Sequence, residues 1–146
     1  MTLQLGLIAF WGLWHSVVLL TNVCEGLKVV KVLPLGWQFA SKNYEAIARV
    51  TEKYRPAHWF PPLLFLGVLL WQFLIVIAFV WAMMASIRSG ANDRAGATVA
   101  FTLSLSLFGA FMLADEVCME YDTEHAHILF FIAQLLTVVA ISILPS

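Results

Sequence analysis

Residues 60–86 read FPPLLFLGVLLWQFLIVIAFVWAMMAS, an apolar run that contains no Asp, Glu, Lys or Arg. A hydrocarbon core about 30 Å thick is crossed by about 20 helical residues, because each residue adds about 1.5 Å. The run exceeds that length, and Pro61 and Pro62 stand where the first turn of a helix tolerates proline. This stretch therefore predicts a transmembrane helix.

Three further apolar runs surround it, at about 3–22, 96–114 and 128–144. A chain of 146 residues cannot bury four such runs in a water-soluble core. The composition agrees: 62% of the residues are hydrophobic and 12% are charged, against about 45–50% and about 25% in soluble domains. We predict an all-α, polytopic integral membrane protein whose four-helix transmembrane bundle forms one domain over residues 1–146.

The first connection, at about 28–59, is the only long one. Within it, residues 41–54 predict a short interfacial helix with Ser41 at its N-cap. The polar turn 88–94 is short, so spans two and three are expected to be antiparallel neighbours. Span three is rich in Gly, Ala, Ser and Thr, which let helix backbones approach closely, and we predict it to be the central packing helix.

Charge is separated between the connections. Four spans place both termini on one membrane face, and the first and third connections on the other. The first connection carries six Lys and Arg, whereas the third, 115–127, carries five Asp and Glu, so we expect the two to attract each other and form a cap. The positive-inside rule places this cap in the cytoplasm. Cys24 and Cys118 also fall on the cap side; they would form a disulfide if that face is oxidising, and otherwise each is a small buried apolar residue.

The cap holds the only constellation of metal-ligand residues that the sequence offers: Glu25, His58, Glu116, Glu120, Glu124, His125 and His127. The three glutamates of the third connection recur every four residues, which places them on one side of a helix. Glu124 and His127 have the i, i+3 spacing that metal sites in helix bundles use. Such ligands suit Zn, Mn or Fe. The alternatives are a role in proton transfer, or a solvated segment whose negative charge balances the positive charge of the first connection.

His15 lies near the middle of span one, where ionisable side chains are costly and are often functional. It is a candidate axial ligand for haem, although no second histidine lies at a matching depth; the alternative is a neutral histidine bonded to a neighbouring helix. Gln72 and Gln134 are expected to make inter-helix hydrogen bonds, or to line a substrate path. The sequence requires no cofactor, and it leaves open whether the protein binds a metal ion or haem.

The order of the spans resembles the bacterial family described as predicted small integral membrane proteins. The resemblance rests on Pro56-Ala-His-Trp59 at the start of span two and on Asp115-Glu-Val-Cys-Met-Glu-Tyr-Asp-Thr123 after span three. Under it, Glu116 matches a family glutamate, whereas Tyr121 replaces a tryptophan and Gln72 stands where the family has a glutamate. The resemblance implies a bacterial inner-membrane protein with cytoplasmic termini, against the charge count. The family has no assigned activity.

Three functions remain open from the sequence. The leading hypothesis is an accessory or structural subunit, without chemistry of its own, that packs against a larger membrane complex or a second copy. The alternatives are a metal- or haem-binding redox or sensor protein, and a small transporter component. No phosphate-binding loop, nucleophile elbow or basic–aromatic patch is present, so no nucleic-acid partner is expected and an enzyme is not favoured. The bilayer is the expected environment.

Overall fold

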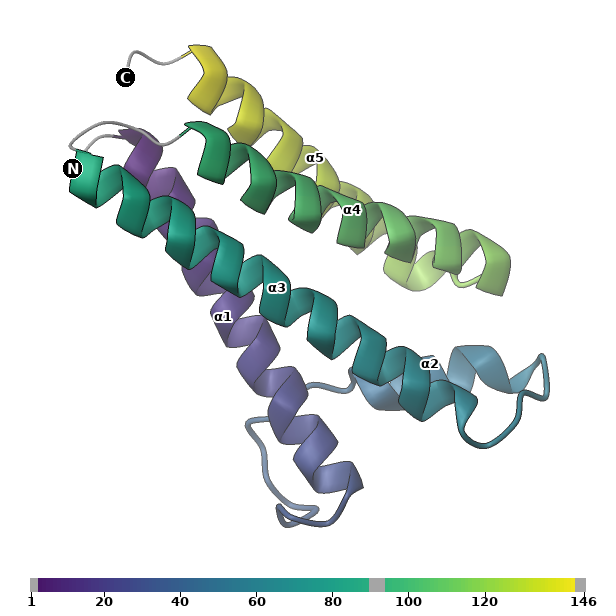
Figure 1. Cartoon of the computed structure of the whole chain (residues 1–146). Helices are drawn as coiled ribbons and strands as arrows, with labels where there is room; N and C mark the ends of the chain where they lie inside the picture. The colour runs from purple at the N-terminus through teal and green to yellow at the C-terminus, as the bar shows by residue number, and fades with distance from the viewer. Residues whose placement is uncertain (1–2, 90–93, 144–146) are drawn as a thin grey trace. The chain divides into compact units, whose positions relative to one another are not determined.

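The computed structural model describes residues 3–89 and 94–143. They form five helices (Figure 1): α1 (Leu3–Val29), α2 (Asn43–Glu52), α3 (Phe60–Ser89), α4 (Arg94–Cys118) and α5 (Tyr121–Ile143). All except α2 are long and apolar enough to cross a membrane. The prediction of an all-α protein with four membrane-spanning helices is therefore confirmed. The predicted turn at 88–94 and the predicted end of span four at 144 lie partly outside the described residues.

The chain divides into two compact units. Unit 1 contains the first half of α1, to Leu13, the second half of α3, from Leu74, and the remainder of the chain. Unit 2 is continuous, from Trp14 to Phe73, and holds the second half of α1, the first connection with α2, and the first half of α3. Each unit is described by itself, and the single domain expected from the sequence stays a prediction.

Helices α4 and α5 lie side by side in unit 1 (Figure 1). Small buried residues on α4, among them Ala97, Ala100 and Ser104, allow neighbouring side chains to approach its backbone. Aromatic rings fill the space beside them: Phe79 of α3 meets Phe101 edge-to-face, with ring centroids 5.0 Å apart. Of the four spans, α4 has the largest buried share, 33%, as expected for a central packing helix.

The beginning of α1 is held in unit 1 by close packing and two hydrogen bonds. A Cβ atom added to Gly12 would lie 3.2 Å from the Cβ of Phe79, so a glycine allows this approach of α1 to α3. The indole nitrogen of Trp11 donates to the Thr137 hydroxyl over 3.1 Å. The amide nitrogen of Gln4 donates to the carbonyl of Ile141, also over 3.1 Å. Both bonds join α1 to α5.

In unit 2 the first connection turns back onto α1, because the backbone nitrogen of Ser41 donates to the Thr21 carbonyl over 3.1 Å. The predicted interfacial helix is present as α2, but its predicted N-cap is wrong. Lys42 occupies that position, and no side chain caps the helix there. The Ser41 hydroxyl, one residue earlier, accepts from the Asn43 backbone nitrogen over 3.3 Å and donates to the Glu25 carboxylate, so it links the start of α2 to α1.

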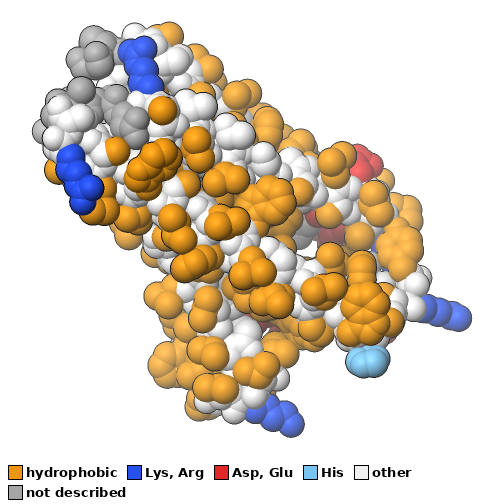
Figure 2. Space-filling view, viewed as in Figure 1, with side chains coloured by type: hydrophobic (Ala, Val, Ile, Leu, Met, Phe, Trp, Pro, Cys, Tyr) orange, Lys and Arg blue, Asp and Glu red, His pale blue; other side chains and the backbone are white. Residues whose placement is uncertain are grey.

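Apolar side chains dominate the surface drawn in Figure 2. This is the expected exterior of a protein surrounded by hydrocarbon rather than water. α5 buries least within the chain: only 11% of its membrane-spanning window is buried. Its other residues are therefore available to lipid or to another helix.

Gly12→Leu should destabilise the protein because its side chain has no room beside Phe79. Overpacking of this kind costs about 1–3 kcal/mol, so the unfolding midpoint in detergent should fall. Gly67→Leu is the matched control, since a Cβ at that position would meet nothing within 4 Å. Equal midpoints for the two variants would contradict the close approach.

Candidate functional site

A chain of amide hydrogen bonds, buried at the link between Asn22 and Gln72, joins three helices of unit 2. The amide nitrogen of Asn22 on α1 donates to the Gln72 side-chain oxygen on α3 over 2.8 Å. The amide nitrogen of Asn43, at the start of α2, donates to the Asn22 oxygen over 2.8 Å. Asn22 and Gln72 are buried, with 0% and 3% of their surface exposed. The inter-helix bond predicted for Gln72 is confirmed, and its partner Asn22 was missed.

Glu25 lies three residues further along α1 and is buried as well, with 4% of its surface exposed. Its carboxylate accepts from the Ser41 hydroxyl and, over 3.5 Å, from the backbone nitrogen of Glu45 in the first turn of α2. A carboxylate near the first turn of a helix also interacts favourably with the helix dipole. Glu25 therefore positions α2, and the sequence had placed it only among metal ligands.

A second polar cluster lies in unit 1, where α4 ends and α5 begins. Nδ1 of His127 is 2.5 Å from Oδ2 of Asp115, and the Thr123 hydroxyl donates to Oδ1 of Asp115 over 3.2 Å. A carboxylate can only accept, so Nδ1 carries the proton and Nε2 is the ring nitrogen left for another interaction. The His127 ring also lies against Phe111, with centroids 4.9 Å apart.

An oriented imidazole of this kind can accept a proton or contribute one ligand to a metal ion. Among residues 3–89 and 94–143, however, no group of three or more His, Cys, Asp or Glu is arranged to hold a metal. Of the predicted ligands in the third connection, only His127 is shown bonded to a carboxylate, and that carboxylate is Asp115. Nδ1 of His125 lies 3.1 Å from the Tyr121 carbonyl of its own helix, and Glu116 is exposed.

Glu120 and Glu124 are half-buried in unit 1, whereas His58 is exposed in unit 2. The predicted metal site of Glu116, Glu120, Glu124, His125, His127 and His58 therefore stays a prediction. Cys24 and Cys118 are free thiols and belong to different units, so their pairing stays a prediction too.

His15 is buried, and its ring meets Trp14 edge-to-face with centroids 4.9 Å apart. Its predicted role as a haem ligand stays a prediction. Gln134 is also fully buried in α5, which agrees with an inward-facing position for this polar residue.

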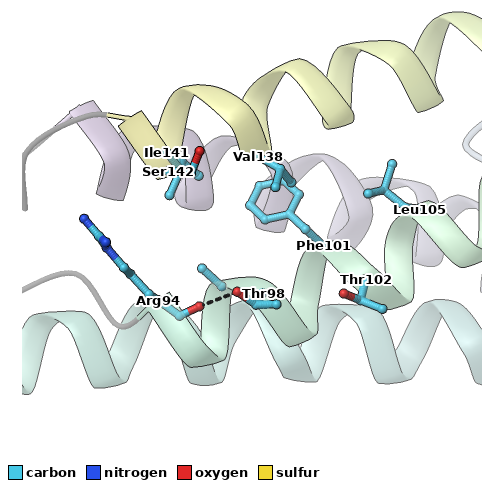
Figure 3. A pocket seen from close by; sticks show the side chains of 9 residues that line it. Arg94, Thr98, Phe101, Thr102, Leu105, Val138, Ile141 and Ser142 are labelled. Atoms are coloured by element: carbon cyan, nitrogen blue, oxygen red, sulfur yellow. Dashed lines mark hydrogen bonds between the residues drawn. The ribbon is translucent and has the colours of Figure 1, made fainter.

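An open groove of about 150 Å³ lies between α4 and α5, near the start of α4 (Figure 3). Phe101, Leu105, Val138 and Ile141 make it mostly apolar, and Arg94 stands at one end. The Thr98 hydroxyl donates to the Arg94 carbonyl over 2.7 Å, so this hydroxyl is satisfied within its own helix. The groove can accept an apolar side chain or an acyl chain.

A ladder of small exposed residues begins at this groove and continues along α4. Its members recur every four residues and therefore form one continuous ridge that winds obliquely along the helix: Thr98, Thr102, Ser106, Ala110 and Ala114. The Ser106 hydroxyl donates to the Thr102 carbonyl over 2.7 Å, so it also needs no outside partner. Gly109 lies beside the ladder, and a Cβ added there would meet nothing within 4 Å.

In comparisons with known proteins, no family model, no curated protein and no solved structure matches the chain.

The bond between Asn22 and Gln72 should be measurable as a coupling energy. Asn22→Leu and Gln72→Leu should each destabilise the protein, while the double variant should lose less than the sum of the two. Buried inter-helix bonds of this kind contribute about 0.6–2 kcal/mol. Unfolding in detergent of the four proteins completes the cycle, and additive losses would contradict the bond.

Asp115→Asn should weaken the end of the α4–α5 hairpin, because an amide is a poorer acceptor than a carboxylate for His127 and Thr123. A loss of about 1–3 kcal/mol in the free energy of unfolding is expected. Glu116→Gln is the control, since its side chain is exposed. Local hydrogen exchange at residues 115–127 should rise only in the first variant.

Proposed function

We propose that this chain is an accessory subunit of a larger membrane protein complex in the bacterial inner membrane, and that α4 packs against a helix of its partner. The single observation that carries the proposal is the exposed ladder from Thr98 to Ala114 on α4, together with the groove at its start. Residues that face only lipid are under no pressure to be small, whereas a close helix–helix contact requires it.

The open space along this side of α4 supports the proposal. The groove between α4 and α5 has room for an inserted side chain from a neighbouring helix. Gly109 has no neighbour where a Cβ would stand. A partner helix on the ladder would fill both places and gain dispersion contacts that fluid lipid makes less well.

The use of the buried polar residues also favours a structural role over transport. Asn22 bonds to both Gln72 and Asn43, and Glu25 bonds to the first connection. The hydrogen bonds of these polar groups are made within the chain, where they stabilise its fold. A carrier of this size would be expected to present such groups to a substrate.

Ala110→Leu should separate the chain from its partner, because a bulky side chain on the ladder keeps the helices apart. Ala133→Leu is the matched control, since Ala133 is an exposed alanine on α5. The measurement is native mass spectrometry after gentle detergent extraction at native expression. We expect a stoichiometric complex for wild type and Ala133→Leu, and at least about tenfold less for Ala110→Leu, a difference of about 1.4 kcal/mol.

A monomeric wild-type protein that is unaffected by Ala110→Leu would overturn the proposal. A complex containing only this chain would identify the partner as a second copy. Destabilisation of the isolated monomer by Ala110→Leu would place the ladder inside the chain's own fold. An absorption spectrum and metal analysis of the same sample test the redox or sensor alternative directly.

A further inference from the structure

The first connection of unit 2, residues 28–59, has a strong excess of positive charge. It contains six Lys and Arg against two Glu, a net charge of +4. We call it the basic connection. Its cations are Lys28, which is half-buried, and five exposed residues: Lys31, Lys42, Arg49, Lys53 and Arg55. Exposed cations of this density raise the local concentration of any anionic partner.

The same connection also exposes large apolar side chains outside any helix. α1 ends at Val29, yet Val32 has 67% of its surface exposed and Leu35 has 81%. Trp37 and Phe39 follow, both exposed. In water, such a loop would leave these large apolar side chains uncovered.

This loop has a defined conformation rather than a loose one. The Val32 backbone nitrogen donates to the Leu27 carbonyl over 2.8 Å, and that of Trp37 donates to the Pro34 carbonyl over 3.0 Å. The Trp37 indole donates to the Phe39 carbonyl over 3.1 Å. The exposed apolar residues are therefore presented by a folded loop.

α2 forms the remaining part of the surface of the basic connection. It packs against α3 through Tyr44, whose ring meets that of Phe65 edge-to-face at 5.5 Å, while Lys53 and Arg49 stay exposed. A shallow hollow of about 650 Å³ lies between α2 and the start of α3. Its lining includes Arg49, Arg55 and Pro61, along with Glu45 and Glu52. The hollow is wide enough for a polar headgroup.

We propose that the basic connection binds the anionic phospholipid headgroups of the membrane leaflet on its side. A leaflet offers negative phosphates to the lysines and arginines, and hydrocarbon to Val32 and Leu35, within a few ångströms of each other. Trp37 and Trp59, both exposed, then lie at the depth where indole rings are favoured.

An acidic protein segment is the competing occupant, and residues 115–124 of this chain are one. Such a segment would neutralise the cations but would leave the apolar loop at residues 30–39 in water. The combination of exposed cations and exposed apolar residues therefore favours lipid. The proposal does not rest on the accessory-subunit function.

The test uses the full chain in nanodiscs that contain equal amounts of phosphatidylglycerol and phosphatidylcholine. Native mass spectrometry of the released protein counts the lipids of each kind that stay bound. Each cation near an anionic surface changes the preference by about fivefold. Wild type should therefore retain phosphatidylglycerol over phosphatidylcholine by much more than about fivefold, and Lys42→Gln with Lys53→Gln, which removes two of the five exposed cations, should lower that ratio about 25-fold. The charge-preserving pair Lys42→Arg with Lys53→Arg should restore it.

Arg88→Gln is the control, because it removes an exposed cation outside the basic connection and outside the groove that Arg94 lines. It should leave the ratio unchanged. A second readout places a fluorophore at Leu35→Cys, in a chain with Cys24→Ala and Cys118→Ala. The proposal expects quenching by lipid-borne nitroxide rather than by aqueous iodide.

Three results would overturn the proposal. The first is an equal retention of both lipids by wild type. The second is an equal loss of preference in the Arg88→Gln control. The third is a preference that emerges only when Glu116, Glu120, Asp122 and Glu124 are changed to Gln, because the acidic segment would then be the occupant of the basic connection.

Discussion

Four apolar helices must find partners in a solvent that is as apolar as they are. Hydrocarbon removes the hydrophobic force that drives helices together in water, so association depends on close packing and on hydrogen bonds. Unit 1 shows the first of these at Gly12, which lets α1 approach Phe79, and at Ala97 and Ala100 of α4, which are buried. Unit 2 shows the second in the bonds from Asn22 to Gln72 and Asn43. Each contact is local to its unit, and such contacts hold together helices whose remaining surface is mostly apolar.

Hydrogen bonds to α1 also organise the long first connection. A segment with many exposed side chains has little burial of its own to hold it. Its attachment comes from α1: Thr21 accepts from the Ser41 backbone, and Glu25 accepts from the Ser41 hydroxyl and from the first turn of α2. A buried carboxylate is costly unless it is bonded. Glu25 is bonded in this way, and it is one of several attachments of α2, beside the bond from Asn43 to Asn22 and the contact of Tyr44 with Phe65.

The sequence predicted the architecture because length and hydropathy decide it. Residues 60–86 could not be anything but a span, and α2 followed from the polar stretch between two such runs. The contacts were harder to predict, because a helix that is apolar on every side does not indicate which side meets lipid and which meets protein. Gln72 was recognised as a hydrogen-bonding residue, but Asn22 could not be matched to it without the register of α1 against α3. Asp115 was counted as one acid among five, whereas its position at the end of α4 brings it to His127 across the hairpin.

α4 carries small residues on two sides, and this is the feature that most separates it from the other spans. Ala97, Ala100 and Ser104 are buried within the chain, while the ladder from Thr98 to Ala114 is exposed. A helix with one neighbour needs one side that permits close approach, and its other side is best filled with bulky residues that suit lipid, as on α3 and α5. Within unit 1, α5 and Phe79 of α3 already lie against α4. The exposed ladder is a further side of the helix, and it is the side on which we propose that a partner helix packs.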